Sequence, residues 1–214
     1  NALDQLTQVT APNGAQTSYT LDALGNRLTE TSPDSGSLQA TYDAAGNRKS
    51  RTDARGITAN YTYDALNRLL TVTYPSTGEN ITYTYDTGIG CTNGIGRLCK
   101  VQDGAGSTTF AYDTQGNLTQ QVRTEAGQNY TTSYGYDSVN RISQVTTPGN
   151  RTITYPRDAL GRIDTVTTSI NGISTGITSQ ITYNALGLVT GQTLANGYTE
   201  SHGFNTDGQT ISLS

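Results

Sequence analysis

Apolar and polar residues alternate along this chain in short runs that are separated by turn residues. In the runs 61–63 and 81–85, tyrosine or isoleucine takes every second position and threonine takes the positions between. A two-residue period places the apolar side chains on one face of a β-strand. Each run ends at an aspartate or asparagine, passes through a few turn residues and continues as a second alternating run. The pattern therefore predicts strand–turn–strand units.

The same unit recurs through the whole chain. With the aspartate that ends 61–63 as a marker, the equivalent positions are Asn1, Asp22, Asp43, Asp64, Asp86, Asp113, Asp137, Asp158, Asn184 and Asn205. Their spacings are 21, 21, 21, 22, 27, 24, 21, 26 and 21 residues. A constant period that fills a chain is typical of a repeat architecture. We expect a single array over residues 1–214, belonging to a longer chain.

Two kinds of turn complete the repeat. The marker opens a tight turn that contains Gly or Asn, as in "DALGN" at 22 and "DALN" at 64, and these residues accept positive φ at low cost. A looser turn with Pro, Gly or Asn closes the unit. One hairpin cannot bury its apolar face alone, so neighbouring units must stack. We predict an all-β fold in which about ten strand–turn–strand repeats form one twisted spiral sheet.

Composition narrows the function. The chain has 24 Gly and 14 Tyr, no Met or Trp, and only 33% hydrophobic residues. Its net charge is −4 and its 13 basic residues are dispersed, which argues against a nucleic-acid partner. No apolar run approaches the roughly 20 residues that span a bilayer, so we expect no membrane span.

The phrases "YDAAGNR" (42–48), "YDALNRL" (63–69), "YDTQGNL" (112–118) and "YDSVNRI" (136–142) resemble the RHS repeat, also called the YD repeat. The resemblance extends over essentially the whole chain. It implies a continuous β-sheet that winds in a spiral and forms a hollow shell. Such shells occur in bacterial RHS polymorphic toxins, in the B and C components of insecticidal toxin complexes, in wall-associated proteins and in teneurins.

In the bacterial members the shell encloses a variable toxic C-terminal domain. The "DPxGL"-type stretch that precedes this domain is absent from the present sequence, as is a toxin domain. No catalytic aspartate of the family is therefore carried over, and the chain resembles shell wall only.

Substitutions within the chain favour a structural role for the Tyr-Asp pair. Asn1, Asn184 and Asn205 replace the marker aspartate; asparagine keeps the oxygen that an Asx-turn needs but loses the charge of a catalytic or metal-binding carboxylate. Phe and Ile replace tyrosine in some repeats, which favours ring packing. The residues interpreted as structural markers are Tyr19, Asp22, Tyr42, Asp43, Tyr63, Asp64, Tyr85, Asp86, Tyr112, Asp113, Tyr136, Asp137, Asp158, Asn184 and Asn205.

An arginine follows most tight turns. We assign one common position to Arg27, Arg48, Arg68, Arg97, Arg141 and Arg162. Its regular place predicts a bond to turn carbonyls or to the marker aspartate, or stacking on a tyrosine.

Few residues remain as candidates for chemistry. His202 occupies a tyrosine position and is interpreted as an aromatic substitute. Cys91 and Cys99 flank a glycine-rich insertion, and we predict a disulfide, with two reduced thiols as the alternative. We expect no catalytic residue, no metal site and no cofactor.

The sequence thus favours a non-catalytic shell segment that encapsulates or presents a toxin or effector cargo. Its expected partners are further RHS repeats of the same parent chain and an enclosed toxin domain. The alternative is an extracellular adhesive surface that binds carbohydrate or protein, with self-association or a filament as its assembly. Both interpretations, and the expected disulfide, predict a secreted or cell-surface location.

Overall fold

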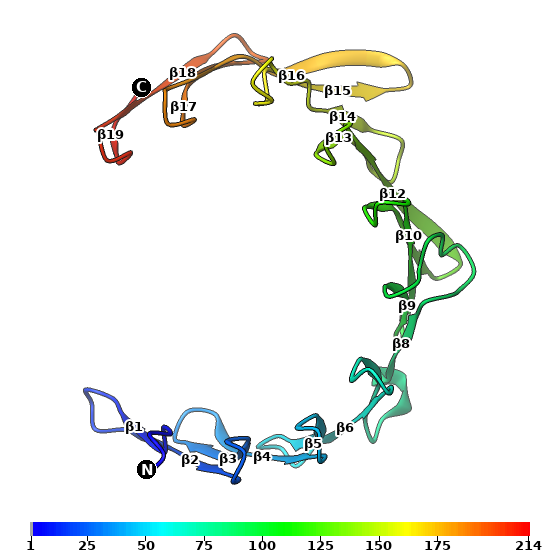
Figure 1. Ribbon diagram of the computed structural model, residues 1–214, viewed down its shortest axis with the longest axis vertical. Coiled ribbons are helices and arrows are strands. Elements are labelled where there is room, and N and C mark those ends of the chain that lie inside the picture. Colours follow the sequence, from blue (N-terminus) through cyan, green and yellow to red (C-terminus); the bar gives the residue numbers. More distant parts are fainter. Residues whose placement is uncertain (1) are drawn as a thin grey trace. The chain divides into compact units, whose positions relative to one another are not determined.

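Residues 2–214 are described by a computed structural model in which almost every element is a β-strand (Figure 1). The chain divides into two units, Asn1–Thr109 and Phe110–Ser214. The marker Asn1 lies outside the described residues. Each unit is a succession of antiparallel hairpins, so the predicted all-β repeat fold is confirmed.

The strands follow one another at short, regular intervals. The first ten are β1 (Gln8–Thr10), β2 (Gln16–Leu21), β3 (Arg27–Ser32), β4 (Gly36–Tyr42), β5 (Arg48–Thr52), β6 (Thr58–Tyr63), β7 (Leu69–Thr73), β8 (Ile81–Tyr85), β9 (Leu98–Gln102) and β10 (Gly106–Tyr112). The others are β11 (Leu118–Glu125), β12 (Gln128–Tyr136), β13 (Ile142–Thr146), β14 (Thr152–Thr154), β15 (Val166–Ile170), β16 (Ile173–Tyr183), β17 (Val189–Leu194), β18 (Thr199–Phe204) and β19 (Thr210–Leu213). A single turn of 3₁₀ helix, η1 (Thr77–Glu79), precedes β8.

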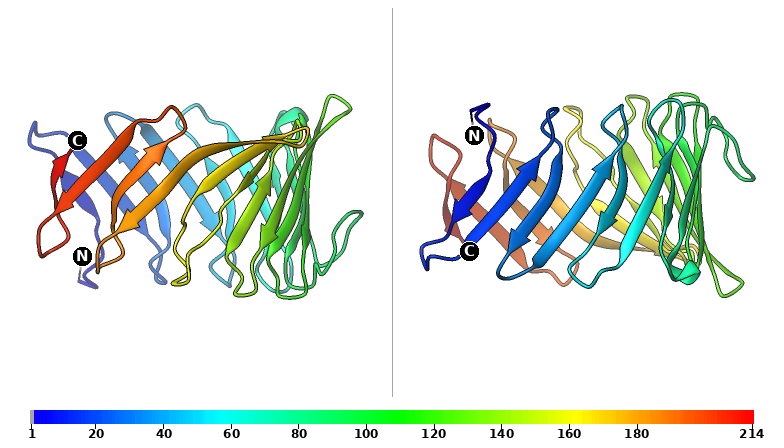
Figure 2. Two further views of the ribbon diagram at one scale, coloured as in Figure 1. Left: turned by 90° about the horizontal axis from the view of Figure 1, so that it is seen from above. Right: turned by 90° about the horizontal axis from the view of Figure 1, so that it is seen from below.

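Pairing follows the order of the chain within each unit. In the first unit every strand from β1 to β9 pairs antiparallel with the next. In the second unit the same holds from β11 to β19. Figure 2 shows the strands of each unit side by side, with turns along both edges of the sheet. Because all connections are local, each repeat bonds mainly to its neighbours.

A β-bulge accompanies most tight turns. The register shifts between Thr41 and Tyr42 and again between Thr62 and Tyr63, in each case just before the marker. A bulge places two residues of one strand opposite one of the other and bends the strand. As a result Tyr42 lies opposite Arg48, and Tyr63 lies opposite Leu69.

One face of the first unit carries the larger side chains. The register aligns Tyr61, Val72 and Ile81 in one row across β6, β7 and β8. Val72 is only 6% exposed. Such cross-strand apolar pairs stabilise a sheet where their faces meet.

The opposite face is dominated by hydroxyl groups. Across the hairpin β6–β7 the hydroxyl oxygens of Thr62 and Thr71 lie 2.7 Å apart, and those of Thr41 and Ser50 lie 2.6 Å apart across β4–β5. In the second unit Thr146 and Thr152 form a similar pair at 3.1 Å. The hydroxyl groups of these threonine and serine residues therefore form hydrogen bonds with one another across neighbouring strands.

Candidate functional site

The tight turn after the tyrosine-rich strand is built around one carboxylate. Oδ1 of Asp64 accepts the backbone N–H groups of Leu66 and Arg68, both at 2.9 Å. Oδ2 accepts Nε–H of Arg68 at 2.6 Å. Asn67 has φ of 60°, a conformation that Asn and Gly adopt with least strain. All of these contacts are local to the turn, so Asp64 closes the hairpin.

We number turn positions from the marker, so that Leu66 is position +2 and Arg68 position +4. The N–H groups of +2 and +4 donate to the marker side chain in the turns of Asp22, Asp43, Asp113, Asp137, Asp158, Asn184 and Asn205. The two asparagines make these bonds through Oδ1 at 2.8–3.1 Å. An amide oxygen thus replaces a carboxylate oxygen without loss of the turn, as expected of an Asx-type cap.

The carboxylates are held in their ionised form. The pKa of the Asp64 carboxyl lies below its ordinary value, chiefly because the Arg68 N–H donates to it. The pKa of Asp43 is lowered chiefly by the side-chain amide of Asn47. A general acid or base needs a pKa near the working pH, and these shifts run the opposite way. The turn chemistry supports structure rather than proton transfer.

The side chain at position +4 also reaches the next repeat. The guanidinium of Arg68 donates to Oδ1 and Oδ2 of Asp86 at 3.1 and 2.7 Å. In another pair of repeats, Nδ2 of Asn47 donates to Oδ1 of Asn67 at 2.7 Å. One side chain therefore joins two successive turns, and the turns support each other along the edge of the sheet.

The tyrosine before the marker, at position −1, forms a second link between repeats. The hydroxyl of Tyr63 donates to the carbonyl oxygen of Arg48 in the preceding repeat at 3.1 Å. The same bond joins Tyr42 to Arg27, Tyr136 to Leu118, and Tyr183 to Ile163. Each accepting residue stands at position +5, directly after the turn. The ring of Tyr85 instead lies under the Arg68 guanidinium, 4.4 Å from it.

Arg157 takes the place of the tyrosine before Asp158. Its Nη2 donates to the carbonyl oxygen of Ile142 at 3.2 Å, which is the bond that the tyrosine hydroxyl makes in other repeats. Tyr19 and Tyr112 lie in β2 and β10, three residues and one residue before their markers. The Tyr-Asp pair thus has two roles. The aspartate closes the turn, and the tyrosine links its repeat to the previous one.

The common position assigned to the arginines from sequence is wrong for two of them. Arg68, Arg141 and Arg162 stand at +4, and each donates Nε–H to its marker aspartate at 2.6–2.8 Å. In the turns of Asp22 and Asp43 an asparagine holds +4 and donates its side-chain amide to the marker, so Arg27 and Arg48 stand at +5.

Arg97 follows a long insertion and donates to the carbonyl oxygens of Asn93 and Ile95. This insertion is fastened at its base. Cys91 and Cys99 are joined by a disulfide, and Cys99 is only 1% exposed. Gly94 lies against both sulfur atoms, where an added Cβ would meet them and the carbonyl oxygen of Asp86. Gly96 N–H donates to Oδ1 of Asp86 at 2.7 Å. The disulfide therefore holds a loop that completes the Asp86 turn.

Two turns of the same kind were missed by the sequence analysis. Oδ1 of Asp53 accepts the N–H groups of Arg55 and Ile57, and Oδ1 of Asp103 accepts those of Ala105 and Gly106. Both lie out of phase with the markers. The signal was present as "DARG", which matches "DALG" in its Asp and Gly.

Other candidate sites have simple surroundings. The His202 ring lies 6.4 Å from that of Phe204 in β18, and its Nε2 is 3.9 Å from a carboxylate oxygen of Glu200. Within residues 2–214, no group of three His, Cys, Asp or Glu side chains has the placement of a metal site. No helix in the same range is long and apolar enough to cross a membrane.

The turn geometry predicts a graded response to substitution of Asp64. Asp64→Asn should lower the midpoint of urea unfolding only slightly, because asparagine makes the same backbone bonds in two other turns. Asp64→Ala should cause a loss several times larger, because two turn N–H groups lose their acceptor. Equal losses for the two variants would contradict a capping role.

The ion pair between Arg68 and Asp86 predicts a loss of stability at acidic pH. Arg68 lowers the pKa of the Asp86 carboxyl from 3.8 to about 2. A carboxyl with a depressed folded-state pKa stabilises the fold above its unfolded value and loses that effect as the pH falls through its folded value. The melting temperature should therefore drop between pH 4 and pH 2. Asp86→Asn should flatten this part of the profile, and an unchanged profile would contradict the pairing.

The disulfide predicts local protection of the insertion. Replacing both cysteines, as Cys91→Ser with Cys99→Ser, should destabilise the protein by about 2.5 kcal/mol on a loop-entropy estimate. Amide hydrogen exchange should accelerate at Gly96 and Arg97, whose N–H groups donate within the loop, and stay unchanged in β4 and β5. Unchanged exchange at Gly96 would contradict this prediction, because the loop would then keep its structure without the disulfide.

Comparisons with known proteins agree with this architecture. A family model described as RHS Repeat matches residues 1–37 and 42–79, and a second, Teneurin YD-shell, matches residues 89–173. A search of curated proteins found no match.

Solved structures show the same fold at low identity. The crystal structure of TcdB2-TccC3-TEV matches 98% of this chain with a TM-score of 0.83 and 17% identity. TcdB2-TccC3 matches 96% with a TM-score of 0.79 and 16% identity. A Photorhabdus luminescens Tc holotoxin pore with a TccC3 mutation matches 92%, with a TM-score of 0.79 and 17% identity.

The chain spans only 11–13% of the length of these three structures. The two family models together match most of the sequence, and the Tyr-Asp turn that defines the repeat recurs in both units. Residues 1–37 and 42–79 therefore carry RHS repeats, residues 89–173 match a YD-shell model, and the chain has the all-β fold of the matched part of these toxin structures.

Proposed function

We propose that this chain is a non-catalytic wall segment of a shell that encloses or presents a toxin or effector cargo. The observation that carries the proposal is the use of the repeated polar residues. Marker side chains close turns, and position −1 tyrosines and position +4 side chains tie one repeat to the next. A wall requires such repetition, whereas an active site requires a convergent set of groups that is free to meet a substrate.

Exposed apolar residues at the turn apex support the idea of a larger assembly. Position +2 carries a large apolar side chain in many turns, with exposures of 61–77% at Leu24, Leu66, Val139, Leu160 and Leu186. The backbone N–H of each is fixed by its marker. A regular series of exposed apolar groups indicates a surface that contacts something else. Further repeats of the same parent chain are the partner we propose for this edge.

An adhesive surface of exposed tyrosines is less well supported. Tyr130 and Tyr198 are 48% and 72% exposed, but neither stands at a repeat tyrosine position. The repeat tyrosines are half-buried, and the hydroxyl groups of several donate a hydrogen bond to a backbone carbonyl oxygen. Rings held in this way offer little face for stacking on a sugar.

We propose a secreted or cell-surface location, since disulfides persist mainly in oxidising compartments. The disulfide of Cys91 and Cys99 supports this proposal. A redox-labelling experiment on the native protein, in which only thiols that are free in the cell react with maleimide, tests it. Labelling of both cysteines in the native protein would oppose it.

Electron microscopy of the full-length native particle tests the shell proposal. A closed hollow particle with internal density, together with a cargo domain that resists protease until the particle is opened by mild denaturant, is the expected result. An open spiral or a filament of repeating subunits would overturn encapsulation and would favour the adhesive surface.

A further inference from the structure

Position +5 follows a simple rule in most tight turns. This residue lies across the hairpin from the position −1 side chain, and it is aliphatic where Tyr63 faces Leu69, Tyr136 faces Ile142 and Tyr183 faces Val189. Leu98, which follows the long insertion after Asp86, faces Tyr85 in the same way. Three turns depart from this rule: Thr210 faces Phe204 in one of them, and the two others are successive and carry a cation. Arg27 faces Leu21 and Arg48 faces Tyr42. Two cations therefore occupy neighbouring places that the repeat pattern reserves for apolar side chains.

The turn chemistry explains why neither arginine is needed to close its turn. Asn26 and Asn47 hold position +4 and donate Nδ2–H to Oδ2 of the marker at 2.9 and 3.1 Å. The markers Asp22 and Asp43 thus have their partners without a guanidinium. Arg27 and Arg48 therefore do not serve as the turn-closing cation. Arg68, in contrast, forms ion pairs with both Asp64 and Asp86.

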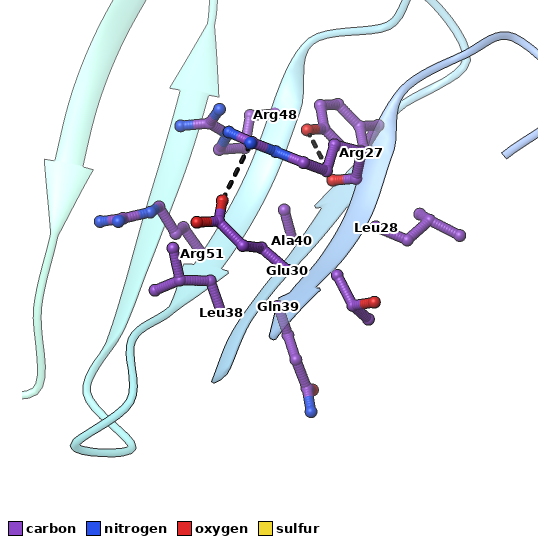
Figure 3. Close-up of a pocket in the computed structure, with 10 residues that line it drawn as sticks. Arg27, Leu28, Glu30, Leu38, Gln39, Ala40, Arg48 and Arg51 are labelled. Carbon is purple, nitrogen blue, oxygen red and sulfur yellow. Dashed lines mark hydrogen bonds and ion pairs between the residues drawn. The ribbon is translucent and has the colours of Figure 1, made fainter. Parts of the chain in front are cut away.

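A small pocket lies between these residues. It has a volume of about 30 Å³, and its polar lining consists mainly of Arg27, Arg48, Arg51, Glu30 and Tyr42, with Leu38 and Ala40 as apolar wall. Figure 3 shows Arg27 and Glu30 on β3 and Arg48 and Arg51 on β5, with Leu38 and Ala40 on β4 between them. The volume suits one small polar group, since a single water needs roughly 10–15 Å³ on this measure.

The pocket has more cations than anions. Glu30 binds Arg27 at 2.9 Å, which leaves Arg48 and Arg51 without a carboxylate within ion-pair distance in the described part of the chain. The Arg48 guanidinium interacts with the side chains of Tyr42 and Tyr61, but its Nε is buried and has no hydrogen-bond partner. Three arginines and one glutamate thus line the pocket, in a protein whose net charge is −4. A buried donor without an acceptor is unusual in a native structure and indicates a missing partner.

We propose that this pocket binds a single small oxyanion group, a carboxylate or a phosphate, through Arg48 and Arg51, with Arg27 as a further cation. Guanidinium groups present fixed pairs of N–H donors that match both oxyanions. The Tyr42 hydroxyl donates to the Arg27 carbonyl oxygen, which fixes the ring beside the pocket. The inference does not depend on shell function, because it uses only contacts within the first unit.

Titration of the ¹⁵N-labelled protein, followed by NMR at constant ionic strength, tests the site. Inorganic phosphate and acetate are titrated separately, which distinguishes the two oxyanion classes, and chloride keeps the ionic strength equal. We expect saturable amide shifts in β3, β4 and β5 with at least one of the two probes. Linear shifts without saturation for both probes would overturn the proposal.

Arg48→Leu is the decisive variant. Leu69 holds the equivalent position in another turn, so the fold should tolerate leucine there. The variant should weaken binding at least tenfold. Arg151→Leu removes the same charge from a residue that binds only the Thr168 hydroxyl in the second unit, and it should bind as the original protein does. Unchanged affinity in Arg48→Leu would overturn the proposal.

A second pair of variants separates the pocket from overall charge. Glu30→Gln removes the carboxylate that competes for Arg27 and should tighten binding at least threefold. Glu79→Gln changes the net charge equally in exposed η1 and should have no such effect. Equal responses would assign the binding to bulk electrostatics and overturn the site. If Arg48→Leu disturbs the amide spectrum outside the pocket, Arg51→Gln, at an exposed residue, gives the same test and should also weaken binding.

Discussion

The structure depends on one interaction, the acceptance of two backbone N–H groups by a single side-chain oxygen at the start of most tight turns. In the Asp64 turn this oxygen binds the N–H groups two and four residues ahead. The bonds fix where the second strand begins and therefore its register. Because the register is fixed, the tyrosine at −1 and the residue at +5 face each other in turn after turn. The contacts that link one repeat to the next depend on that alignment.

The links between repeats use groups that the turn leaves available. The Tyr63 hydroxyl reaches the Arg48 carbonyl, and the Arg68 guanidinium reaches Asp86 while it still holds Asp64. Little of the stability comes from a thick apolar core. Among the described residues only Ala59, Val72, Cys99 and Ala111 are buried hydrophobic side chains. Cross-strand pairs, hydroxyl pairs and turn bonds must therefore carry a large part of the fold.

Much of this architecture was predictable from the sequence, because its signals are local. Alternation of Tyr and Thr predicts strands, and Asp with a following Gly or Asn predicts the turn, so the repeat fold follows from the pattern. The side-chain assignments were harder. Arg48 and Arg68 both follow Asn in the sequence, yet they stand at +5 and +4 because the positive-φ residue at +3 is Gly46 in one turn and Asn67 in the other. Counting residues from the marker separates these positions, but only the register shows which side chain each arginine faces.

Other features depend on surroundings that a pattern of residues does not contain. Asp53 was missed because its turn lies at the closing end of a repeat, where the phase marker is not expected. The exposure of Leu66 and Leu160 is also invisible in an alternation pattern, which records side-chain polarity but not what covers it. The disulfide pairing required only that two cysteines eight residues apart meet at the base of one loop.

The restriction of bonds to neighbouring repeats has a consequence for how such a chain can change over generations. A duplicated stretch of one period brings its own marker, its own tyrosine and its own position +4 side chain, and the new junctions reproduce bonds that already exist elsewhere in the array. Deletion of one period restores the same junction. The gene can therefore grow or shrink by whole units with little structural penalty, while a gain or loss of one residue inside a strand would turn its tyrosines to the opposite face.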